Sequence, residues 1–383
     1  MNRIIVIEPQ CRGFAHARFN AALLATIGAA YPDGEIDFVS EREHAGQVSL
    51  LASGVLPESV RLCNVDGRST WPRNSWLRML AEYRFCTRVL ARFRERRADM
   101  LLFSSVSAQT LIAVKRLLLQ EPTSGVVIAI PHSVLGGLDC PSRRVWNRPL
   151  SIGNALKLPV PPSLRCLALS RTILSAVTAS HGAAGWRHMH LPCIFDAQQA
   201  RFDETVTRAV FGFFGALREE MAQYCALVEN VTRKVPDAAF VLVGHCLSGG
   251  SYAERLARHV TGVGDTPISD TEYQRRARTV THAVFLLPAS HYRYKSSTGI
   301  MDAFNYQKPI ICLKNPLLDE YAASMGDLGY APSTLQELED VVASLAQALP
   351  TSRYSRQVTA IIRGRDQFSP KALSTAFRLA VEK

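Results

Sequence analysis

The sequence predicts an α/β protein of two Rossmann-like domains with a cleft between them. Short apolar runs alternate with segments of helical periodicity, which is the pattern of parallel sheets covered by helices. The alternation fills the first half of the chain and starts again near residue 209. The length of 383 residues suits two domains. A hydrophobic content of 47% supplies a core for each and excludes a largely disordered chain.

The first half is expected to contain five strands separated by helices. The strands are predicted at 3–9, 35–41, 98–105, 124–133 and 164–170. Helices are predicted at 17–32, where Pro32 closes the pattern, near 107–120, and just after residue 170.

The second half repeats the pattern. Strands are predicted at 210–217, 238–245, 281–290 and 308–314, and helices at 218–237, 297–307, 335–348 and 369–382. Four divisions follow: a first domain over 1–195, a linker over 196–208, a second domain over 209–360, and a helical segment over 361–383 that packs back toward the first domain.

Cysteine spacing and hydropathy bear on the cellular compartment. The nine cysteines are dispersed without a CxxC pair, which argues against a zinc site or a disulfide framework. The longest uncharged stretch, 122–138, is shorter than the ~20 apolar residues of a membrane span and contains two prolines. The apolar start is interrupted by Glu8 and indicates a strand rather than a signal peptide. We expect a cytoplasmic protein, peripheral on the inner face of the cell membrane.

The net charge of +11 is unevenly distributed. Residues 1–195 hold 23 Lys and Arg against 13 Asp and Glu, so this half carries +10 and the remainder +1. Such asymmetry indicates an anionic partner for the first domain, either a membrane surface or a nucleic acid.

Seven segments, in order, carry a resemblance to a known family. They are the strand that ends at His132, the strand that ends at Ser170, and the segments 191–196, 211–221, 235–245, 268–290 and 301–313. Together they resemble the GT-B glycosyltransferases of family 4, and the similarity covers roughly residues 120–350. The resemblance implies a glycosyltransferase that uses a nucleotide-diphospho-sugar and a lipid-linked or polysaccharide acceptor at the cytoplasmic membrane face. It also implies retention of configuration, with no metal and no cofactor beyond the donor.

The sequence departs from the family's double-glutamate motif. Alignment through Lys308 and Pro309 places Asp302 at the second acid and Tyr294 at the first. Ala216 and Met221 stand where the family has the basic residues that hold the diphosphate.

The donor site is predicted at the start of the helix at 297–307. A leaving diphosphate needs stabilisation, and backbone amides at a helix N-terminus supply it. The residues are Ser296, Ser297, Thr298 and Gly299, of which Gly299 would let phosphate approach the backbone. The alternative is that Ser297 or Thr298 serves only as an N-cap.

Other donor-side residues are predicted around this helix. The resemblance implies that Asp302 accepts hydrogen bonds from ribose hydroxyls. The alternative is that Asp302 is a solvated acid in the first turn of this helix, where the helix dipole favours a negative charge. Arg218 is the preferred cation for the diphosphate, with Arg293 and Lys295 as competitors, or it is a surface residue. Gly215 and Gly244 end their strands at the carboxyl edge, where open sheets bind ligands, or they serve only tight turns.

On the first domain, His132 is the catalytic candidate. It follows a strand where the family's histidine enters the cleft, and a neutral imidazole there could donate to a sugar hydroxyl. A purely structural histidine is the alternative. Gly13, His16 and Asn20 are predicted to bind the acceptor, with His16 and Asn20 on one helical face.

The stretch 71–97 is the predicted membrane contact. It carries eight arginines and two glutamates, interleaved with aromatic and aliphatic residues. Such a helix fits an anionic lipid surface, or it is a domain helix with solvated arginines. The residues proposed to contact lipid are Trp76, Arg88, Arg92, Arg96 and Arg97.

Two other functional classes remain. A noncatalytic GT-B protein that binds a sugar nucleotide or a partner transferase would explain the missing first acid. A nucleic-acid-binding protein is suggested by charge alone and lacks any recognisable module. We therefore expect no nucleic-acid partner.

Overall fold

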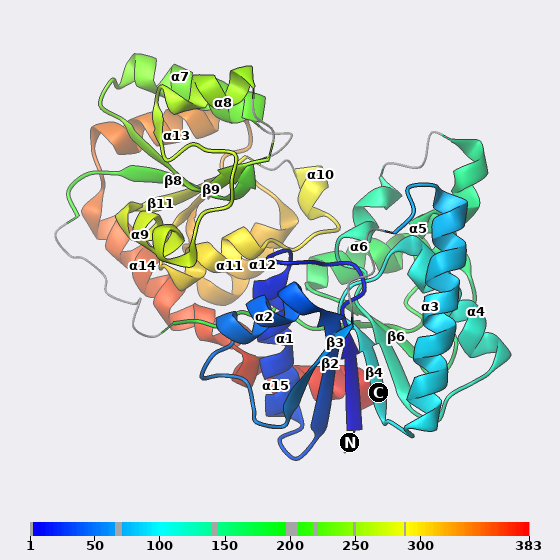
Figure 1. The fold of residues 1–383 in the computed structure, drawn as a ribbon. Helices are drawn as coiled ribbons and strands as arrows, with labels where there is room; N and C mark the ends of the chain where they lie inside the picture. Colours follow the sequence, from blue (N-terminus) through cyan, green and yellow to red (C-terminus); the bar gives the residue numbers. More distant parts are fainter. Residues whose placement is uncertain are drawn as a thin grey trace. The chain divides into compact units, whose positions relative to one another are not determined.

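The computed structural model describes residues 3–65, 71–139, 144–196, 206–217, 221–247, 250–286 and 289–382. They form two compact units (Figure 1). The first unit takes in the chain up to Ile194, together with Arg293–Ser296 and the stretch from Gln367. The second unit consists of Phe195–Tyr292 and Ser297–Asp366.

The first unit is built on a sheet of seven parallel strands. Their order across the sheet is β3-β2-β1-β4-β5-β6-β7. The strands are β1 (Arg3–Ile7), β2 (Glu35–Glu41), β3 (Val60–Val65), β4 (Met100–Phe103), β5 (Val126–Ala129), β6 (Leu164–Ala168) and β7 (Trp186–His188). Because β1 pairs with both β2 and β4, the strand order reverses between β1 and β4. Open sheets of this kind bind ligands beyond the carboxyl ends of the strands at that point.

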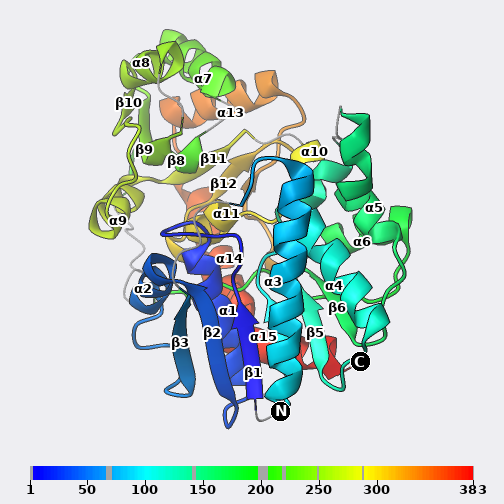
Figure 2. The same cartoon turned by 45° about the vertical axis from the view of Figure 1, so that its right-hand side comes forward.

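Helices cover both faces of this sheet (Figures 1 and 2). On one face α1 (Ala17–Ala30) packs against α2 (Arg42–Leu51) and α15 (Pro370–Glu382). On the other, α3 (Ser75–Glu95) packs against α4 (Ala108–Gln120). The remaining helices are η1 (Val134–Leu138), η2 (Val145–Leu150), α5 (Ile152–Lys157) and α6 (Arg171–His181). Burial on both faces explains why the central strands are continuous apolar runs.

The second unit has a six-stranded parallel sheet in the order β10-β9-β8-β11-β12-β13. Its strands are β8 (Val210–Leu217), β9 (Ala239–Cys246), β10 (Val260–Thr261), β11 (His282–Phe285), β12 (Ile310–Cys312) and β13 (Gly329–Tyr330). The order reverses between β8 and β11, which is the same arrangement as in the first unit.

Helices also cover both faces of the second sheet (Figure 1). α7 (Met221–Lys234) packs against α8 (Ser251–Ala257) and α13 (Leu335–Gln347). The others are α9 (Asp270–Thr279), α10 (Ala289–Tyr292), α11 (Thr298–Asn305), α12 (Pro316–Met325), α14 (Thr351–Gly364) and η4 (Arg365–Phe368).

Each unit has its own hydrophobic core. In the first, residues such as Leu90 of α3 and Leu111 of α4 pack on the sheet. In the second, Phe213 and Phe240 of neighbouring strands pack with Val228 of α7. The prediction of two Rossmann-like domains is therefore confirmed.

The chain passes from one unit to the other at residues that differ from those indicated by the sequence. The sequence places 196–208 as a linker, whereas the change of unit falls between Ile194 and Phe195, and 197–205 lie outside the described residues. The stretch 361–366 belongs to the second unit, while α15 packs on α1 in the first. The predicted strand at 281–290 ends at Phe285.

Candidate functional site

A buried carboxylate lies at the reversal point of the first sheet. Glu8 follows β1 and is only 3% exposed. Its two oxygens accept hydrogen bonds from the backbone N–H groups of Gln10 (2.8 Å) and Cys11 (3.0 Å), from the Asn20 amide (3.2 Å), from the Ser104 hydroxyl (2.9 Å) and from the Ser105 hydroxyl. Ser104 and Ser105 directly follow β4, so the cluster joins the ends of the two strands at the reversal point.

These donors determine the charge state of Glu8. Burial alone would raise the pKa of the Glu8 carboxyl, because it removes the charged form from water. The hydrogen bonds from Ser105, Gln10, Asn20 and Ser104 outweigh that effect and lower the pKa below its ordinary value of 4.5. The first unit therefore holds a fixed negative charge at this edge of its sheet.

A chain of hydrogen bonds extends from Glu8 to the loop before α1. The Asn20 amide nitrogen also lies 2.8 Å from His44 Nε2, and His44 Nδ1 lies 2.9 Å from the carbonyl oxygen of Gly13. A carbonyl only accepts, so His44 Nδ1 donates and His44 Nε2 accepts from Asn20. Gly13 has a φ of 48°, a conformation that favours glycine. The chain fixes the shape of the loop.

His132 lies next to this loop, just after β5. Its ring centroid is 4.5 Å from that of His16 and 5.2 Å from that of Phe19. His132 Nε2 is enclosed and has no hydrogen-bond partner among the described residues. The pKa of His132 is lowered to about 3, mainly by burial and also by the neighbouring His16, while Glu8 acts in the opposite direction. His132 is thus a neutral imidazole whose Nε2 makes no hydrogen bond with the described residues.

The predicted acceptor residues cluster here, but their geometry differs from the prediction. His16 is not on the helix: it precedes α1 as the N-cap, with a left-handed φ of 59°. Asn20 is fully buried and holds Glu8 and His44. The four-residue spacing therefore does not place them on one exposed helical face. Of the three predicted residues, Asn20 is buried and stabilises the loop through its hydrogen bonds to Glu8 and His44.

The second unit presents the start of α11 at the end of β8. The Ser297 hydroxyl accepts from the Ile300 N–H (3.3 Å), so Ser297 is the N-cap, and Thr298 is the exposed first residue of the helix. A Cβ on Gly299 would lie 3.5 Å from the carbonyl oxygen of Phe214 and 3.2 Å from the Phe285 ring. The helix start thus lies close against the ends of β8 and β11, where a side chain at position 299 would crowd the Phe285 ring.

Asp302 has a partner that the sequence does not reveal. The hydroxyl of Tyr273, on α9, donates to Asp302 Oδ2 at 2.7 Å. The Tyr273 ring lies edge-on to Phe214, with centroids 6.3 Å apart. Asp302 is half-buried, and the bond orients its carboxylate one turn into α11.

The backbones of Gly215 and Gly244 lie close together at the ends of their strands. They lie opposite each other in the β8–β9 register, with φ values of 95° and 154°. A Cβ on Gly244 would lie 1.9 Å from the Gly215 carbonyl oxygen. These glycines shape the carboxyl edge of the sheet rather than a tight turn.

Three predicted donor residues are placed differently or not described. Tyr294, at the position of the family's first acid, is 4% exposed and belongs to the core of the first unit. The Ser296 hydroxyl donates to the carbonyl oxygen of Leu169 in the same unit (3.1 Å). Their predicted place on the second domain is therefore wrong.

Arg218 lies outside the described residues. Arg293, its competitor, is 3.9 Å from Asp139 within the first unit.

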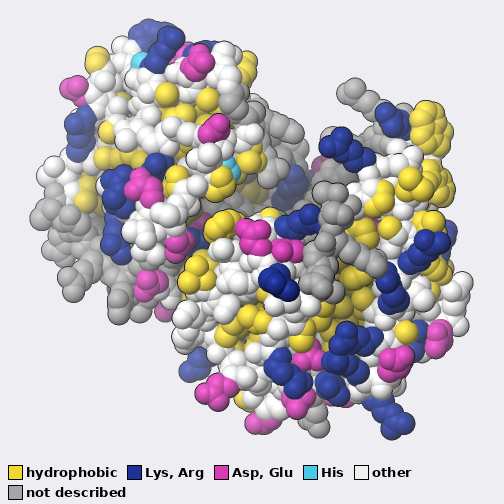
Figure 3. Space-filling model, viewed as in Figure 1, with side chains coloured by type: hydrophobic (Ala, Val, Ile, Leu, Met, Phe, Trp, Pro, Cys, Tyr) yellow, Lys and Arg dark blue, Asp and Glu magenta, His cyan; other side chains and the backbone are white. Residues whose placement is uncertain are grey.

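The predicted membrane residues are spread along α3, which is about 30 Å long given its 21 residues. Trp76 in the first turn is 50% exposed. Arg88 and Arg92 are exposed farther along. Arg96 instead forms an ion pair with Asp37 (2.7 Å), and Arg97 follows the helix end with a φ of 47°. Figure 3 shows hydrophobic and basic side chains over this part of the unit. Among the described residues, no helix has the length and apolarity to cross a bilayer.

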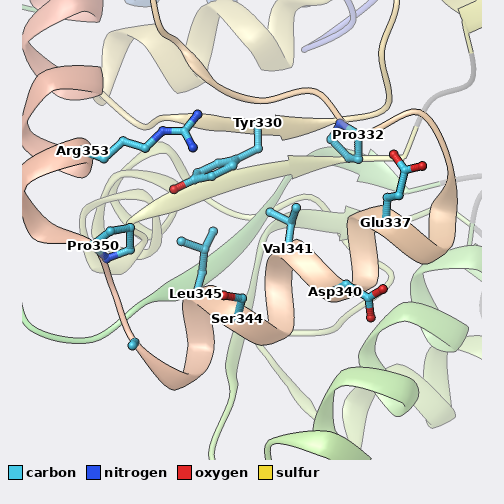
Figure 4. Close-up of a pocket in the computed structure, with 10 residues that line it drawn as sticks. Tyr330, Pro332, Glu337, Asp340, Val341, Ser344, Leu345, Pro350 and Arg353 are labelled. Atoms are coloured by element: carbon cyan, nitrogen blue, oxygen red, sulfur yellow. The ribbon is translucent and has the colours of Figure 1, made fainter.

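A separate hollow of about 690 Å³ lies on the second unit, between β13, α13 and α14 (Figure 4). The Arg353 guanidinium stacks on the Tyr330 ring, 4.2 Å from its centroid, and also bonds Asp327. Asp340 pairs with Lys234 (2.8 Å). Because these polar groups bond within the protein and the hollow lies at the sheet's edge strand, it is not the candidate site.

Comparison with known proteins rests on structure alone, since the sequence matches no family model and no curated protein. Sucrose-phosphate synthase from Thermosynechococcus elongatus aligns over 100% of this chain and 98% of its own, with a TM-score of 0.66 and 13% identity. A TarM mutant from S. aureus, solved with UDP, aligns over 100% of both chains with a TM-score of 0.64 and 8% identity. The chain has the GT-B fold.

The GT-B neighbours include more than one kind of enzyme. UDP-GlcNAc 2-epimerase from Neisseria meningitidis, solved with UDP-GlcNAc, aligns over 100% of both chains with a TM-score of 0.51 and 12% identity. Identities this low establish the GT-B fold and leave family 4 membership as a resemblance. The function must be argued from the residues.

Proposed function

We propose that the protein is a glycosyltransferase that moves a sugar from a nucleotide-diphospho-sugar to a lipid-linked or polysaccharide acceptor at the cytoplasmic membrane face, with retention and without a metal. The observation that carries the proposal is that both sheets present polar groups at their reversal points. In the first unit these are His132 and the Glu8 cluster, and in the second the start of α11.

The second unit would bind the donor. Negative charge develops on the diphosphate as the glycosidic bond breaks, and the amides at the α11 start stabilise that charge. Because Gly299 has no side chain, phosphate oxygens would approach the backbone there. Asp302, oriented by Tyr273, would accept hydrogen bonds from the ribose hydroxyls.

The first unit would bind the sugar and the acceptor. His132 Nε2 would hydrogen-bond a sugar hydroxyl as a neutral group, because burial holds its pKa near 3. The negative charge of Glu8 lies beneath the same loop, where it would favour the positive charge that develops on the sugar ring as the leaving group departs. His16 and the backbone of Gly13 would line the acceptor side.

A panel of UDP-, GDP- and ADP-sugars tests the proposal. Calorimetry should find one nucleotide that binds, and a coupled assay should detect slow release of the nucleoside diphosphate, accelerated by a lipid-linked or polysaccharide acceptor. Product analysis should show a transferred sugar and no epimerised donor. The absence of binding to every nucleotide would overturn the proposal.

Substitution of Gly299 should weaken donor binding. In Gly299→Val the new side chain would crowd the Phe285 ring and the Phe214 carbonyl oxygen, and we expect it to displace the helix start. We expect the nucleotide Kd to rise about tenfold or more, as for the loss of a charged hydrogen bond. Gly264→Val is the matched control, because nothing lies within 4 Å of a Cβ at Gly264. Equal affinity in both variants would remove the α11 start from the site.

A noncatalytic sugar-nucleotide-binding protein is the second candidate. Its support is the aromatic Tyr294, buried in the first unit, at the position of the first acid. Tight binding of a nucleotide sugar with no turnover, together with binding to a partner transferase, would favour this function.

A further inference from the structure

An exposed apolar surface lies where α3 begins. Five large hydrophobic side chains are 48–65% exposed there: Trp76, Leu77 and Leu80 of α3, and Val145 and Trp146 of η2. η2 packs against α3, so the two groups share one surface, the α3–η2 patch. Figure 3 shows hydrophobic side chains gathered over this part of the first unit. A contiguous patch with two exposed tryptophans is uncommon on a surface that contacts only water.

Basic residues border the α3–η2 patch. On α3, Arg84 and Arg88 follow Leu80 at helical spacing on the exposed side, and Arg73 precedes the helix. On η2, Arg148 is exposed. Arg78 is different: it pairs with the buried Glu82 (2.5 Å) and faces inward. No acidic residue of the first three turns of α3 is exposed, since Glu82 is 0% exposed.

We propose that the α3–η2 patch inserts into the interfacial region of an anionic bilayer. Tryptophan favours that region because its ring is apolar and its N–H is polar. The leucines and Val145 would enter the acyl boundary while Arg84, Arg88 and Arg148 contact acidic headgroups. The charge of +10 on residues 1–195 would draw this unit to the surface.

This assignment changes the contact predicted from the sequence. Arg96 and Arg97 lie at the far end of α3, and Arg96 is held by Asp37. η2, which the sequence does not indicate, supplies two of the five apolar side chains. The proposal does not depend on the proposed transfer reaction, because membrane binding and nucleotide binding can be measured separately.

Flotation with vesicles tests the proposal. The full chain should float with vesicles that contain phosphatidylglycerol and not with phosphatidylcholine alone. The triple variant Trp76→Ser, Leu80→Ser, Trp146→Ser should lose about tenfold or more of its binding, given the apolar area that it removes. Leu50→Ser with Leu119→Ser is the control, because these leucines are 67% and 47% exposed on α2 and α4.

Two further measurements separate insertion from other contacts. Lipids brominated in the acyl chain should quench the fluorescence of the wild type and not of the triple variant. Arg84→Gln with Arg88→Gln should weaken binding and Arg97→Gln should not. Unchanged flotation of the triple variant, or the absence of quenching, would overturn the proposal. So would a wild-type dimer in sedimentation that the triple variant abolishes, since the patch would then bind a second copy.

Discussion

His132→Ala is expected to lower turnover by ~10²-fold or more while changing nucleotide affinity little. The enclosed Nε2 is then lost as a partner for the sugar, whereas the α11 start on the second unit is untouched. The measurement is steady-state kcat with the identified donor, beside calorimetry of the nucleotide alone. Phe19→Leu is the matched control, since Phe19 contacts the same ring without a polar atom. Full turnover in His132→Ala would make His132 structural.

The pH dependence of the same reaction gives an independent check. Because the pKa of His132 is lowered to about 3 by burial, the imidazole is neutral throughout an assay between pH 5 and 9. We expect no change of kcat near pH 6.5 that disappears in His132→Gln. An ionisation near pH 6.5 that belongs to His132 would mean that the ring is open to water.

Glu8→Ala should destabilise the first unit by about 3–5 kcal/mol. It removes the acceptor of five hydrogen bonds and leaves Asn20, Ser104 and Ser105 without their buried partner. Urea unfolding followed by tryptophan fluorescence measures the loss, because all four tryptophans of the chain belong to the first unit. Glu8→Gln keeps the shape and one acceptor oxygen, so it should lose less. Equal free energies of unfolding for wild type and Glu8→Ala would show that the hydrogen bonds to Glu8 do not stabilise the first unit.

Glu8 also predicts how stability varies with pH. Its folded pKa lies below the ordinary 4.5, so its contribution is fully present above about pH 4.5 and is lost as the pH falls through the folded pKa. The unfolding free energy of the wild type should therefore fall in acid more steeply than that of Glu8→Gln. Parallel curves for the two proteins would contradict the assigned pKa direction.

The nine predicted strands are all present, and those that the sequence missed share one cause. β3, β7, β10 and β13 are the outer strands of the two sheets. A central strand is buried on both faces and must be an apolar run, which is visible in a sequence. An outer strand needs no such run: β3 reads VRLCNV, and β10 and β13 are two residues long.

The sequence predicted those parts of the candidate site that are marked by neighbouring residues in one segment of the chain. His132 follows a strand, and the α11 start contains three hydroxyl residues and a glycine in succession, so both can be located from the chain alone. Glu8 was visible as a charge that interrupts an apolar run, but its partners Ser104 and Ser105 lie 96 and 97 residues away. Tyr273 reaches Asp302 across 29 residues. Contacts that depend on the order of strands in a sheet have no local signature.

The packing of α15 on α1 has a consequence for synthesis of the chain. Of the 14 residues of α1, 12 are buried, and the ring of Phe377 from α15 lies 6.4 Å from that of Tyr31 just after α1. On the ribosome, α1 is made long before α15, so the part of α1 that α15 covers stays uncovered until α15 has been synthesised. During that interval the nascent chain would be a client for holdase chaperones. A fragment that stops before residue 367 would carry the same uncovered surface permanently and should aggregate.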